Sequence, residues 1–516
     1  MNQLIRTIIM MFAMISPLLS QPAFSAPATI TAHQMLGSSN FERLLQFKIN
    51  GQLLTLLLDP SYVTADMTTL GGQGEQIDGP DIKTFTGQVK GEEDSWVRIT
   101  LGQSAVRGII SRNGRRFEVT TRTGGQFDIK PLAHNVSHST HDLTRRIETR
   151  RQVLSLNSAK PVTRVAKIAI VVDSQYNDKF NGAGVEKALS IINAVDGIYR
   201  EEFGLALDVQ TIISFDDRQS DPFVYGSVPI ETMLRNFRQY RMHNNNLQDV
   251  SLVHLFTGNK NTDEPVGLAW IDTACRTDGY DVGISTPYRH DILLAAHEIA
   301  HNLGAHHDSD TACAADSDKV MWPYISSQTS QKFSSCTHQA VRLSLESSCH
   351  VPAIDLQITL SAADNNTLDA VVKNNDSVQA SLSAVVSIDL PEGTIAAALP
   401  GNCRTTQENI ECQIGTLQPN TEDHIVIDLQ HSEPVNQPES QVLRAEVVLQ
   451  GAIDVRSENN SATATLSFGK LAPTTVAIAN DHNTDSVSGG NSGAGVISLP
   501  GVFLLAALLP FVSTRV

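Results

Sequence analysis

The stretch that decides the fold is His297–Asp308, which reads HEIAHNLGAHHD. His297 and His301 stand four residues apart, so on a helix of about 3.6 residues per turn they lie on one face. Two imidazoles in this relation can bind one metal ion, while Glu298 projects toward the open side of that ion. The pattern therefore predicts a metal site carried by a helix.

The residues that follow complete this predicted site. Gly304 can adopt the left-handed conformation that ends a helix and reverses the chain. The reversal brings His307 to the same ion as a third ligand. Three protein ligands leave a fourth position for water, which is the arrangement of catalytic rather than structural zinc. The expected cofactor is one Zn2+ ion bound by His297, His301 and His307.

This donor set predicts hydrolysis of peptide bonds. Zinc in such a site lowers the pKa of its bound water to about 7 and polarises a substrate carbonyl. Glu298 can accept the proton of the attacking water and deliver it to the leaving amine. An isolated His-Glu-x-x-His occurs by chance in long chains, but the addition of Gly304 and His307 makes coincidence rare.

Composition limits the class of protein. A chain of 516 residues is too long for one core, so two or three domains are expected. Hydrophobic residues at 41% and charged residues at 18% are typical of a globular protein. The formal charge of -17 argues against nucleic acid as a partner.

The N-terminus predicts export. In residues 1–26, Arg6 precedes the apolar run Thr7–Leu19, and small residues around Ala26 offer a cleavage site, as in a signal peptide. The alternative is an N-terminal membrane anchor. An exported chain can oxidise its cysteines, and an even count of six predicts three disulfides. The cysteines are Cys275, Cys313, Cys336, Cys349, Cys403 and Cys412.

Residues 27–160 predict a β-rich segment. Asn50-Gly51 and Asn113-Gly114 are hairpin turn signals. The segment ends in a basic stretch with paired arginines at 145–146 and 150–151, which suits either proteolytic processing or a solvated linker. The expected strands are Leu45–Ile49, Leu53–Leu58, Trp96–Leu101, Arg107–Ser111 and Arg116–Thr121.

Residues 162–350 predict an α/β domain, because helices alternate with strands. The expected strands are Val165–Val172, Leu207–Ile213 and Val250–Phe256, and the expected helices are Gly184–Phe203, Pro229–Tyr240 and Arg289–Leu303. The last of these carries His297 and is apolar ahead of it, which fits a helix through the centre of the domain.

Beyond this domain the pattern changes to short strands. Residues 352–468 predict an immunoglobulin-like β-sandwich, in which Cys403 and Cys412 clip one hairpin. Residues 470–495 are rich in Ser, Gly, Asn and Asp, as in a flexible linker. Residues 496–516 are an apolar tail, either a sorting signal that is removed or a permanent anchor, so membrane association is possible.

The motif His297–Asp308 resembles that of the metzincin metalloproteases, and most of all their adamalysin (reprolysin) branch. The resemblance implies a methionine turn beneath the zinc, and Met321 stands at the matching distance after His307. A plain core methionine is the alternative for this residue. By the same resemblance Asp308 is a buried structural carboxylate bonded to nearby backbone, whereas His306 points away from the ion.

The resemblance extends over roughly residues 40–350. Gly267, Leu268 and Ala269 are similar to the edge strand that binds substrate by β-augmentation. Lys332–Cys336 resembles the Phe-Ser-x-Cys segment of the family, and residues 85–119 resemble part of its propeptide. The implied disulfides are Cys275–Cys349 and Cys313–Cys336.

The chain also departs from the family. The propeptide contains no cysteine, so a thiolate on the zinc cannot keep the enzyme latent. Lys319 replaces a cysteine that the family often has, and no disintegrin domain follows. The sandwich and the tail, with Gly489-Gly490 ahead of it, resemble exported proteins of Gram-negative bacteria. In the propeptide, His134, His138 and His141 form either a loose metal-binding cluster or part of a solvated linker.

The sequence thus predicts a secreted or cell-surface zinc endopeptidase of a Gram-negative bacterium, made as a zymogen and acting on protein or peptide substrates. Its predicted architecture is a β-rich propeptide, an α/β metzincin catalytic domain and a C-terminal β-sandwich. One alternative is a zinc amidase that acts on other substrates. Another is an inactive cell-surface binding protein on a metzincin scaffold, which intact Glu298 argues against.

Overall fold

The computed structural model describes residues 28–29, 43–49, 52–64, 67–121, 126–132, 138–139, 162–224, 228–259, 265–326, 329–362, 366–406, 409–432 and 439–468. These residues all belong to one compact unit. The expected signal peptide, the Asn50-Gly51 turn, the paired arginines, the linker and the apolar tail lie outside the described residues. Within the described part of the chain, no helix is long and apolar enough to cross a membrane.

An antiparallel sheet forms most of the N-terminal lobe, a name used here for the described residues between 28 and 132. Its strand order is β1-β9-β8-β7-β6-β5-β3-β2, around an apolar core of its own. The β7–β8 hairpin turns through Asn113 and Gly114, whose φ angles of 51° and 70° suit a two-residue turn, as expected. The strands are β1 (Ala28–Thr29), β2 (Arg43–Ile49), β3 (Gln52–Pro60), β5 (Lys83–Val89), β6 (Trp96–Leu101), β7 (Val106–Arg112), β8 (Arg115–Thr121) and β9 (Gln126–Pro131).

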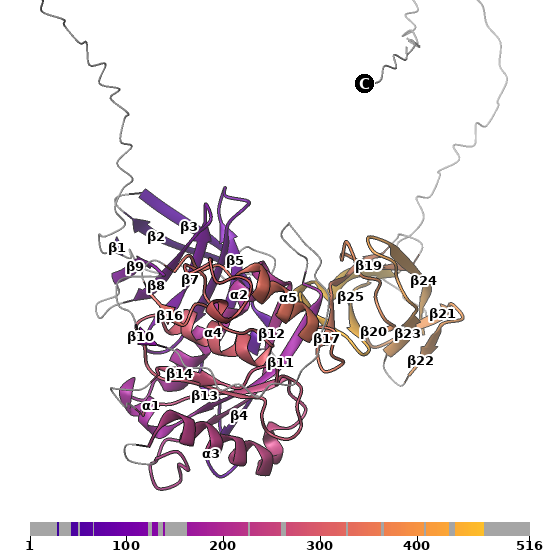
Figure 1. The fold of residues 1–516 in the computed structure, drawn as a ribbon. Coiled ribbons are helices and arrows are strands. Elements are labelled where there is room, and N and C mark those ends of the chain that lie inside the picture. The colour runs from indigo at the N-terminus through magenta and orange to yellow at the C-terminus, as the bar shows by residue number, and fades with distance from the viewer. Residues whose placement is uncertain are drawn as a thin grey trace, which may run out of the picture. The chain divides into compact units, whose positions relative to one another are not determined.

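A second, mostly parallel sheet forms the centre of the α/β domain (Figure 1). Its order is β14-β15-β13-β11-β12-β4, with β14 antiparallel at one end. The strands are β11 (Arg164–Val172), β12 (Leu205–Ser214), β13 (Leu252–Phe256), β14 (Gly267–Ala269), β15 (Val282–Ser285) and β4 (Thr68–Gly71). The last of these comes from the segment that the sequence assigns to the propeptide, and it pairs in parallel with β12.

Helices cover both faces of this sheet. They are α1 (Ser174–Lys179), α2 (Gly184–Phe203), α3 (Ile230–His243), α4 (Asp291–Asn302) and α5 (Ser335–Ser344). Along β11, Ile168 and Ile170 share a core with α2 and α4, whereas Ala169 and Val171 share a core with α3. Burial on both faces explains the almost continuous apolar run of this strand.

The C-terminal part of the unit consists of two antiparallel sheets that share one apolar core. One has the order β18-β19-β24-β21 and the other β22-β23-β20-β25-β27. The strands are β18 (Leu356–Ala362), β19 (Thr367–Asn374), β20 (Ala384–Asp389), β21 (Thr394–Ala398), β22 (Cys403–Thr405), β23 (Asn409–Ile414), β24 (Glu422–His431), β25 (Glu439–Leu449) and β27 (Ser461–Phe468).

Short strands join these parts. β17 (Val351–Ile354) pairs with the start of β11 and with β26 (Ile453–Asp454). β10 (His138–Ser139) pairs antiparallel with β16 (Tyr324–Ile325), directly after the predicted methionine turn. His134 and His141, two of the loose propeptide histidines, lie outside the described residues.

Candidate metal centre

The helix α4 carries the first two predicted ligands, and all of its residues are buried. Its apolar residues, among them Leu293, Ala296 and Ile299, belong to the same core as α2 and the central sheet. The Tyr199 hydroxyl of α2 donates a 2.6 Å hydrogen bond to the carbonyl oxygen of Ala296. The helix that carries the site is therefore held on several sides.

The C-terminal end of α4 is satisfied by the turn that the sequence predicts. Gly304 has a φ of 94°, its N–H donates to the His301 carbonyl at 2.9 Å, and the Ala305 N–H donates to the Ala300 carbonyl at 2.9 Å. This pair of bonds is a Schellman motif, which needs a left-handed residue at this position. The motif turns the chain so that His307 returns to the helix.

The loop after β14 also binds carbonyls at this helix end, one of them the His301 carbonyl that Gly304 already contacts. The Asp272 N–H donates to the His301 carbonyl and the Thr273 N–H donates to the Asn302 carbonyl, each at 3.0 Å. The Asn302 side-chain amide donates back to the carbonyls of Trp270 and Val282, at 3.0 and 3.1 Å. The orphan carbonyls of the helix terminus are thus paired, and the helix is fixed to the edge of the sheet.

The structure brings the three predicted histidine ligands together. The Nε2 atom of His297 lies 3.0 Å from that of His301 and 3.2 Å from that of His307. All three residues are buried. His306, between them, is exposed.

The Nδ1 atoms of His297 and His301 determine that the Nε2 atoms point toward the candidate metal position. His297 Nδ1 lies 2.7 Å from the Val320 carbonyl and His301 Nδ1 lies 2.7 Å from the Ala305 carbonyl. A carbonyl only accepts, so each Nδ1 carries the proton and each Nε2 presents a lone pair. Burial, with the neighbouring His307, lowers the pKa of His297 to about 3, and burial lowers that of His301 well below its usual range. Both imidazoles are therefore neutral, the form that binds metal.

This donor set fits zinc. A tetrahedral zinc with Zn–N bonds of about 2.0–2.1 Å needs ligand nitrogens about 3.3 Å apart. The observed separations of 3.0 and 3.2 Å are close to that value. His297 and His301 carry their protons on Nδ1, so their two Nε2 atoms cannot form a hydrogen bond with each other. A cation bound between the Nε2 atoms explains why they lie so close together.

The predicted general base lies beside the edge strand β14. Glu298 is buried, and a Cβ atom built on Gly267 would lie 2.4 Å from its Oε1 atom. The carboxylate therefore packs directly against the backbone of β14, where only glycine leaves room. Leu268 and Ala269 are buried, and β14 is the terminal strand of the sheet within the described residues.

The segment bonded to His297 holds Met321, whose side chain is fully buried. The Val320 N–H donates to the Lys332 carbonyl and the Met321 carbonyl accepts from the Asp308 N–H, both at 2.9 Å. This turn is thus bonded directly to one ligand, His297, and to Asp308, the residue that follows a second ligand, His307. The Asp308 carboxylate is buried as expected, but its bond is to the Ser334 hydroxyl rather than to backbone.

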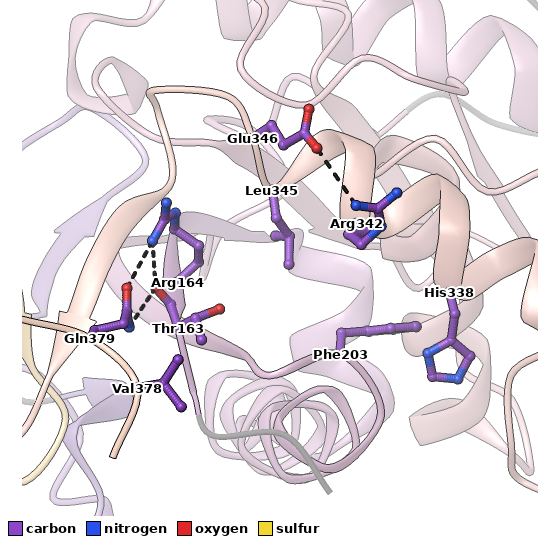
Figure 2. A pocket seen from close by; sticks show the side chains of 9 residues that line it. All are labelled: Thr163, Arg164, Phe203, His338, Arg342, Leu345, Glu346, Val378 and Gln379. Carbon is purple, nitrogen blue, oxygen red and sulfur yellow. Dashed lines mark hydrogen bonds and ion pairs between the residues drawn. The ribbon is translucent and has the colours of Figure 1, made fainter. Parts of the chain in front are cut away.

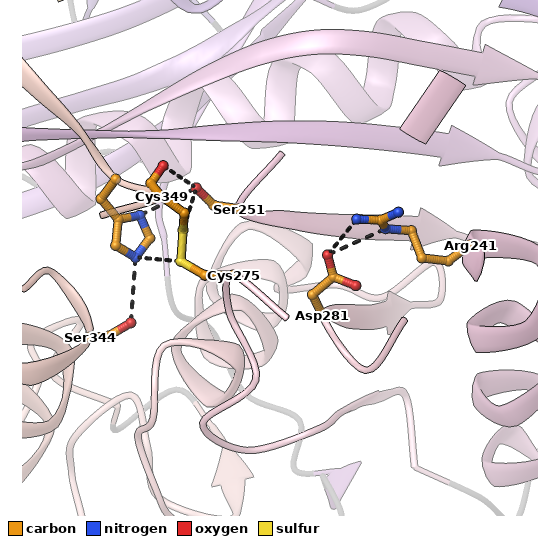
Figure 3. Close-up of a disulfide and its surroundings, with 7 residues drawn as sticks. Arg241, Ser251, Cys275, Asp281, Ser344 and Cys349 are labelled. Carbon is orange, nitrogen blue, oxygen red and sulfur yellow. Dashed lines mark hydrogen bonds and ion pairs between the residues drawn. A yellow bond between two sulfur atoms is a disulfide. The ribbon is translucent and has the colours of Figure 1, made fainter. Parts of the chain in front are cut away.

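The three disulfides pair as expected: Cys275–Cys349, Cys313–Cys336 and Cys403–Cys412. Figure 3 shows the first. The ring of the buried His350 lies beside it, with Nε2 3.7 Å from the Cys275 sulfur. This disulfide fastens the loop that caps α4 to the end of the α/β domain. The third links Cys403 and Cys412 where they face each other in the β22–β23 hairpin.

A separate cleft of about 400 Å3 opens at the start of β11 (Figure 2). Its wall includes Phe203, His338 and Leu345 of the α/β domain and Val378 and Gln379 of the sandwich. Gln379 donates to the Thr163 carbonyl at 3.3 Å and accepts from Arg164 at 3.2 Å. None of the three histidine ligands lines this cleft.

Sequence reasoning missed the residues that support the site from a distance. Tyr199, Asn302 and Ser334 each make a buried hydrogen bond to the site-bearing segments. Their partners lie 20 to 97 residues away in the chain, so no local spacing signals them.

A central helix and the turn after it thus bring three imidazoles together, next to a segment that holds a buried methionine. Residues 162–341 match the sequence model of metallo-peptidase family M12, of reprolysin type. The chain therefore contains a reprolysin-like metallopeptidase domain of that family.

Two solved structures are reported for comparison. The crystal structure of metalloproteinase-II from Bacteroides fragilis is 13% identical, with a TM-score of 0.40, and the match covers 60% of this chain and 93% of that one. A structure of a chaperone–substrate complex is 11% identical, with a TM-score of 0.26, over 46% of this chain and 39% of that one. Both TM-scores are low, so the family assignment rests on the sequence match.

Proposed function

We propose that the chain is a zinc-dependent endopeptidase in which Glu298 serves as general base and acid. The observation that carries the proposal is the convergence of three Nε2 atoms, two of them fixed as lone-pair donors by backbone carbonyls. Zinc, when bound by His297, His301 and His307, supplies a water of lowered pKa and a polarised substrate carbonyl. The metallopeptidase family of this domain supports both the metal and the peptide substrate.

Two features of Glu298 support a role in proton transfer. Glu298 follows His297 in α4 and its carboxylate packs against Gly267 of the edge strand. A substrate that extends the sheet beside β14 would run past this carboxylate, so its scissile bond and the proton acceptor would lie close together. In this role Glu298 takes the proton of the attacking water and passes it to the leaving amine.

We also propose that the protein is exported and is made as a zymogen. The apolar residues 1–26, the paired arginines at 145–146 and 150–151, and the three disulfides support this. The two-sheet C-terminal part serves as an immunoglobulin-like accessory domain, and residues 496–516 as a sorting or anchoring tail at the surface of a Gram-negative bacterium. N-terminal sequencing and the intact mass of the secreted species test these points; a mature chain that still begins near residue 27 rejects the zymogen.

The chemistry is tested on purified mature protein with casein as substrate, with and without a chelator. The expected result is that the chelator abolishes hydrolysis, that zinc restores it, and that Glu298→Gln retains zinc but loses activity. Undiminished proteolysis by Glu298→Gln would contradict the proposed mechanism. Absence of proteolysis in a zinc-loaded wild-type chain would favour an amidase or a binding protein.

A further inference from the structure

The N-terminal lobe docks on the outer face of α2, the helix that packs against the site-bearing α4. Strands β6 and β7 lie against it, and the Trp96 ring sits on Gly197, where a Cβ atom would come within 2.5 Å of the ring. As a result α2 is buried along almost its entire length. A helix buried on every side is enclosed between two layers of structure.

Charge complementarity is the main feature of this contact. Three arginines of the lobe, Arg98, Arg107 and Arg116, meet four carboxylates of α2, Glu186, Asp196, Glu201 and Glu202. We call these seven residues the arginine clamp. Arg98 Nε lies 3.0 Å from Asp196 Oδ2, and one nitrogen of Arg116 lies 2.6 Å from Glu201 and 2.8 Å from Glu202.

Two ion pairs of the clamp, Arg98–Asp196 and Arg116–Glu202, are buried, which separates them from ordinary surface ion pairs. The side chains of Arg98 and Asp196 are 5% and 0% exposed, and those of Arg116 and Glu202 are 2% and 5% exposed. Exposed pairs contribute little to stability, whereas removing one partner of a buried pair is strongly destabilising. Asp196 also accepts from Arg200 and from the Leu207 N–H, so its geometry is fixed within the α/β domain.

Hydrogen bonds to backbone groups and apolar contacts add to this interface between the lobe and α2. Glu186 accepts hydrogen bonds from the N–H groups of Ser104 and Ala105 at 2.9 and 3.1 Å, and Asn193 donates to the Ile99 carbonyl at 3.1 Å. Val63, Ile109 and Leu132 of the lobe are buried in the same apolar core as α2 and α4, while β4 pairs with β12.

None of these contacts uses the stretch between residues 133 and 161, which contains the paired arginines. A cut in that stretch therefore breaks the chain but no bond of the clamp. We propose that the N-terminal lobe stays bound to α2 as a non-covalent subunit after this cut, and that the arginine clamp holds it there. The role of this retention in maturation rests on the proposed zymogen. The binding of the lobe to α2 does not.

Retention of the lobe would have a consequence for the metal site. Arg116 also donates to the Gln331 carbonyl, next to Lys332, whose carbonyl accepts from the Val320 N–H. Val320 in turn accepts from His297. The lobe thus touches the segment that orients a ligand.

The experiment uses the full chain with Glu298→Gln, which prevents self-digestion. The chain is cut with an arginine-specific protease, fragment masses establish cleavage between residues 145 and 151, and native mass is measured by size-exclusion chromatography with light scattering in 0.15 M NaCl. The expected result is one particle that contains both fragments. Two separated fragments, with the metallopeptidase fragment still folded and zinc-loaded, would overturn the proposal whether or not the protein is a protease.

Matched variants test the clamp. Arg107→Gln with Arg116→Gln should weaken fragment association at least tenfold. Arg112→Gln with Lys130→Gln removes the same charge from the lobe, at two residues whose partners, Glu92 and Asp128, lie within the lobe, and should leave association unchanged. Equal effects of the two pairs would overturn the role of the clamp. If the first pair does not fold, Arg107→Gln against Arg112→Gln gives the same comparison.

Discussion

His297 Nδ1 lies 2.7 Å from the carbonyl oxygen of Val320, the residue directly before Met321. This contact joins the helix that carries the ligands to the methionine turn beneath them. It fixes the tautomer of His297 and the orientation of its ring, which is the usual role of an outer partner in a metal site. The ligand is thus held by the backbone of Val320, while the side chain of the next residue, Met321, is buried in the apolar core.

Met321→Ala should weaken both the fold and the metal site. Loss of a fully buried methionine side chain costs about 2–5 kcal/mol of unfolding free energy. Relaxation of the turn should also lower zinc affinity about 10- to 100-fold. Urea unfolding and zinc competition with a chelator measure the two effects. Met242→Ala, at a residue 41% exposed, is the control; zinc affinity in Met321→Ala equal to that of the control would refute the supporting role.

Gly267→Ala should reduce catalysis while zinc is retained. The new methyl group would lie 2.4 Å from the Glu298 carboxylate, so the general base or the edge strand must move. A displacement of about 1 Å at a reacting group can cost roughly 100-fold in rate. Measured kcat should fall by about that factor with one zinc per chain. Gly401→Ala, where a Cβ meets nothing within 4 Å, should be silent, and wild-type kcat in Gly267→Ala would count against the assigned position of Glu298.

Stability should fall in acid through Glu202. Burial acts to raise the pKa of this carboxyl, but a hydrogen bond with His338 and the charges of Arg116 and Lys332 lower it to about 2. A depressed pKa means stabilisation that is complete above the unfolded value of 4.5 and is lost as pH falls toward 2. The difference corresponds to on the order of 3 kcal/mol.

Thermal unfolding between pH 7 and pH 3 checks this expectation. Glu202→Gln should be less stable than wild type at pH 7, and the gap should narrow below pH 4.5. Glu346→Gln, at a side chain 54% exposed, should run parallel to wild type. A constant gap between Glu202→Gln and wild type across this range would show that the carboxylate does not contribute as described.

Much of the fold follows from local pattern. The bounds of α2 agree with the predicted Gly184–Phe203, because its apolar period is regular and Gly204, at a φ of 66°, ends it. The strand β11 was predictable as Val165–Val172, because a strand buried on both faces is almost continuously apolar. The strand β4 was not, since its four residues have neither alternation nor length and depend on β12 for their pairing.

The residues of the metal site were also predictable from local pattern. The distant residues that support the site were not. His297, His301 and Gly304 lie within one turn or two of each other, so helix geometry alone places them. Ser334 reaches Asp308 across 26 residues, and the arginine clamp joins residues about 80 to 100 positions apart. Such contacts depend on tertiary packing and cannot be predicted from the local sequence.

The central claim is that His297, His301 and His307 bind one catalytic zinc. Elemental analysis of purified protein after dialysis against metal-free buffer tests it most directly. The wild type should contain one zinc per chain, His307→Ala should contain almost none, and His306→Ala, at the exposed neighbour, should still contain one. Equal zinc content in His307→Ala and His306→Ala, or none in the wild type, would contradict the account.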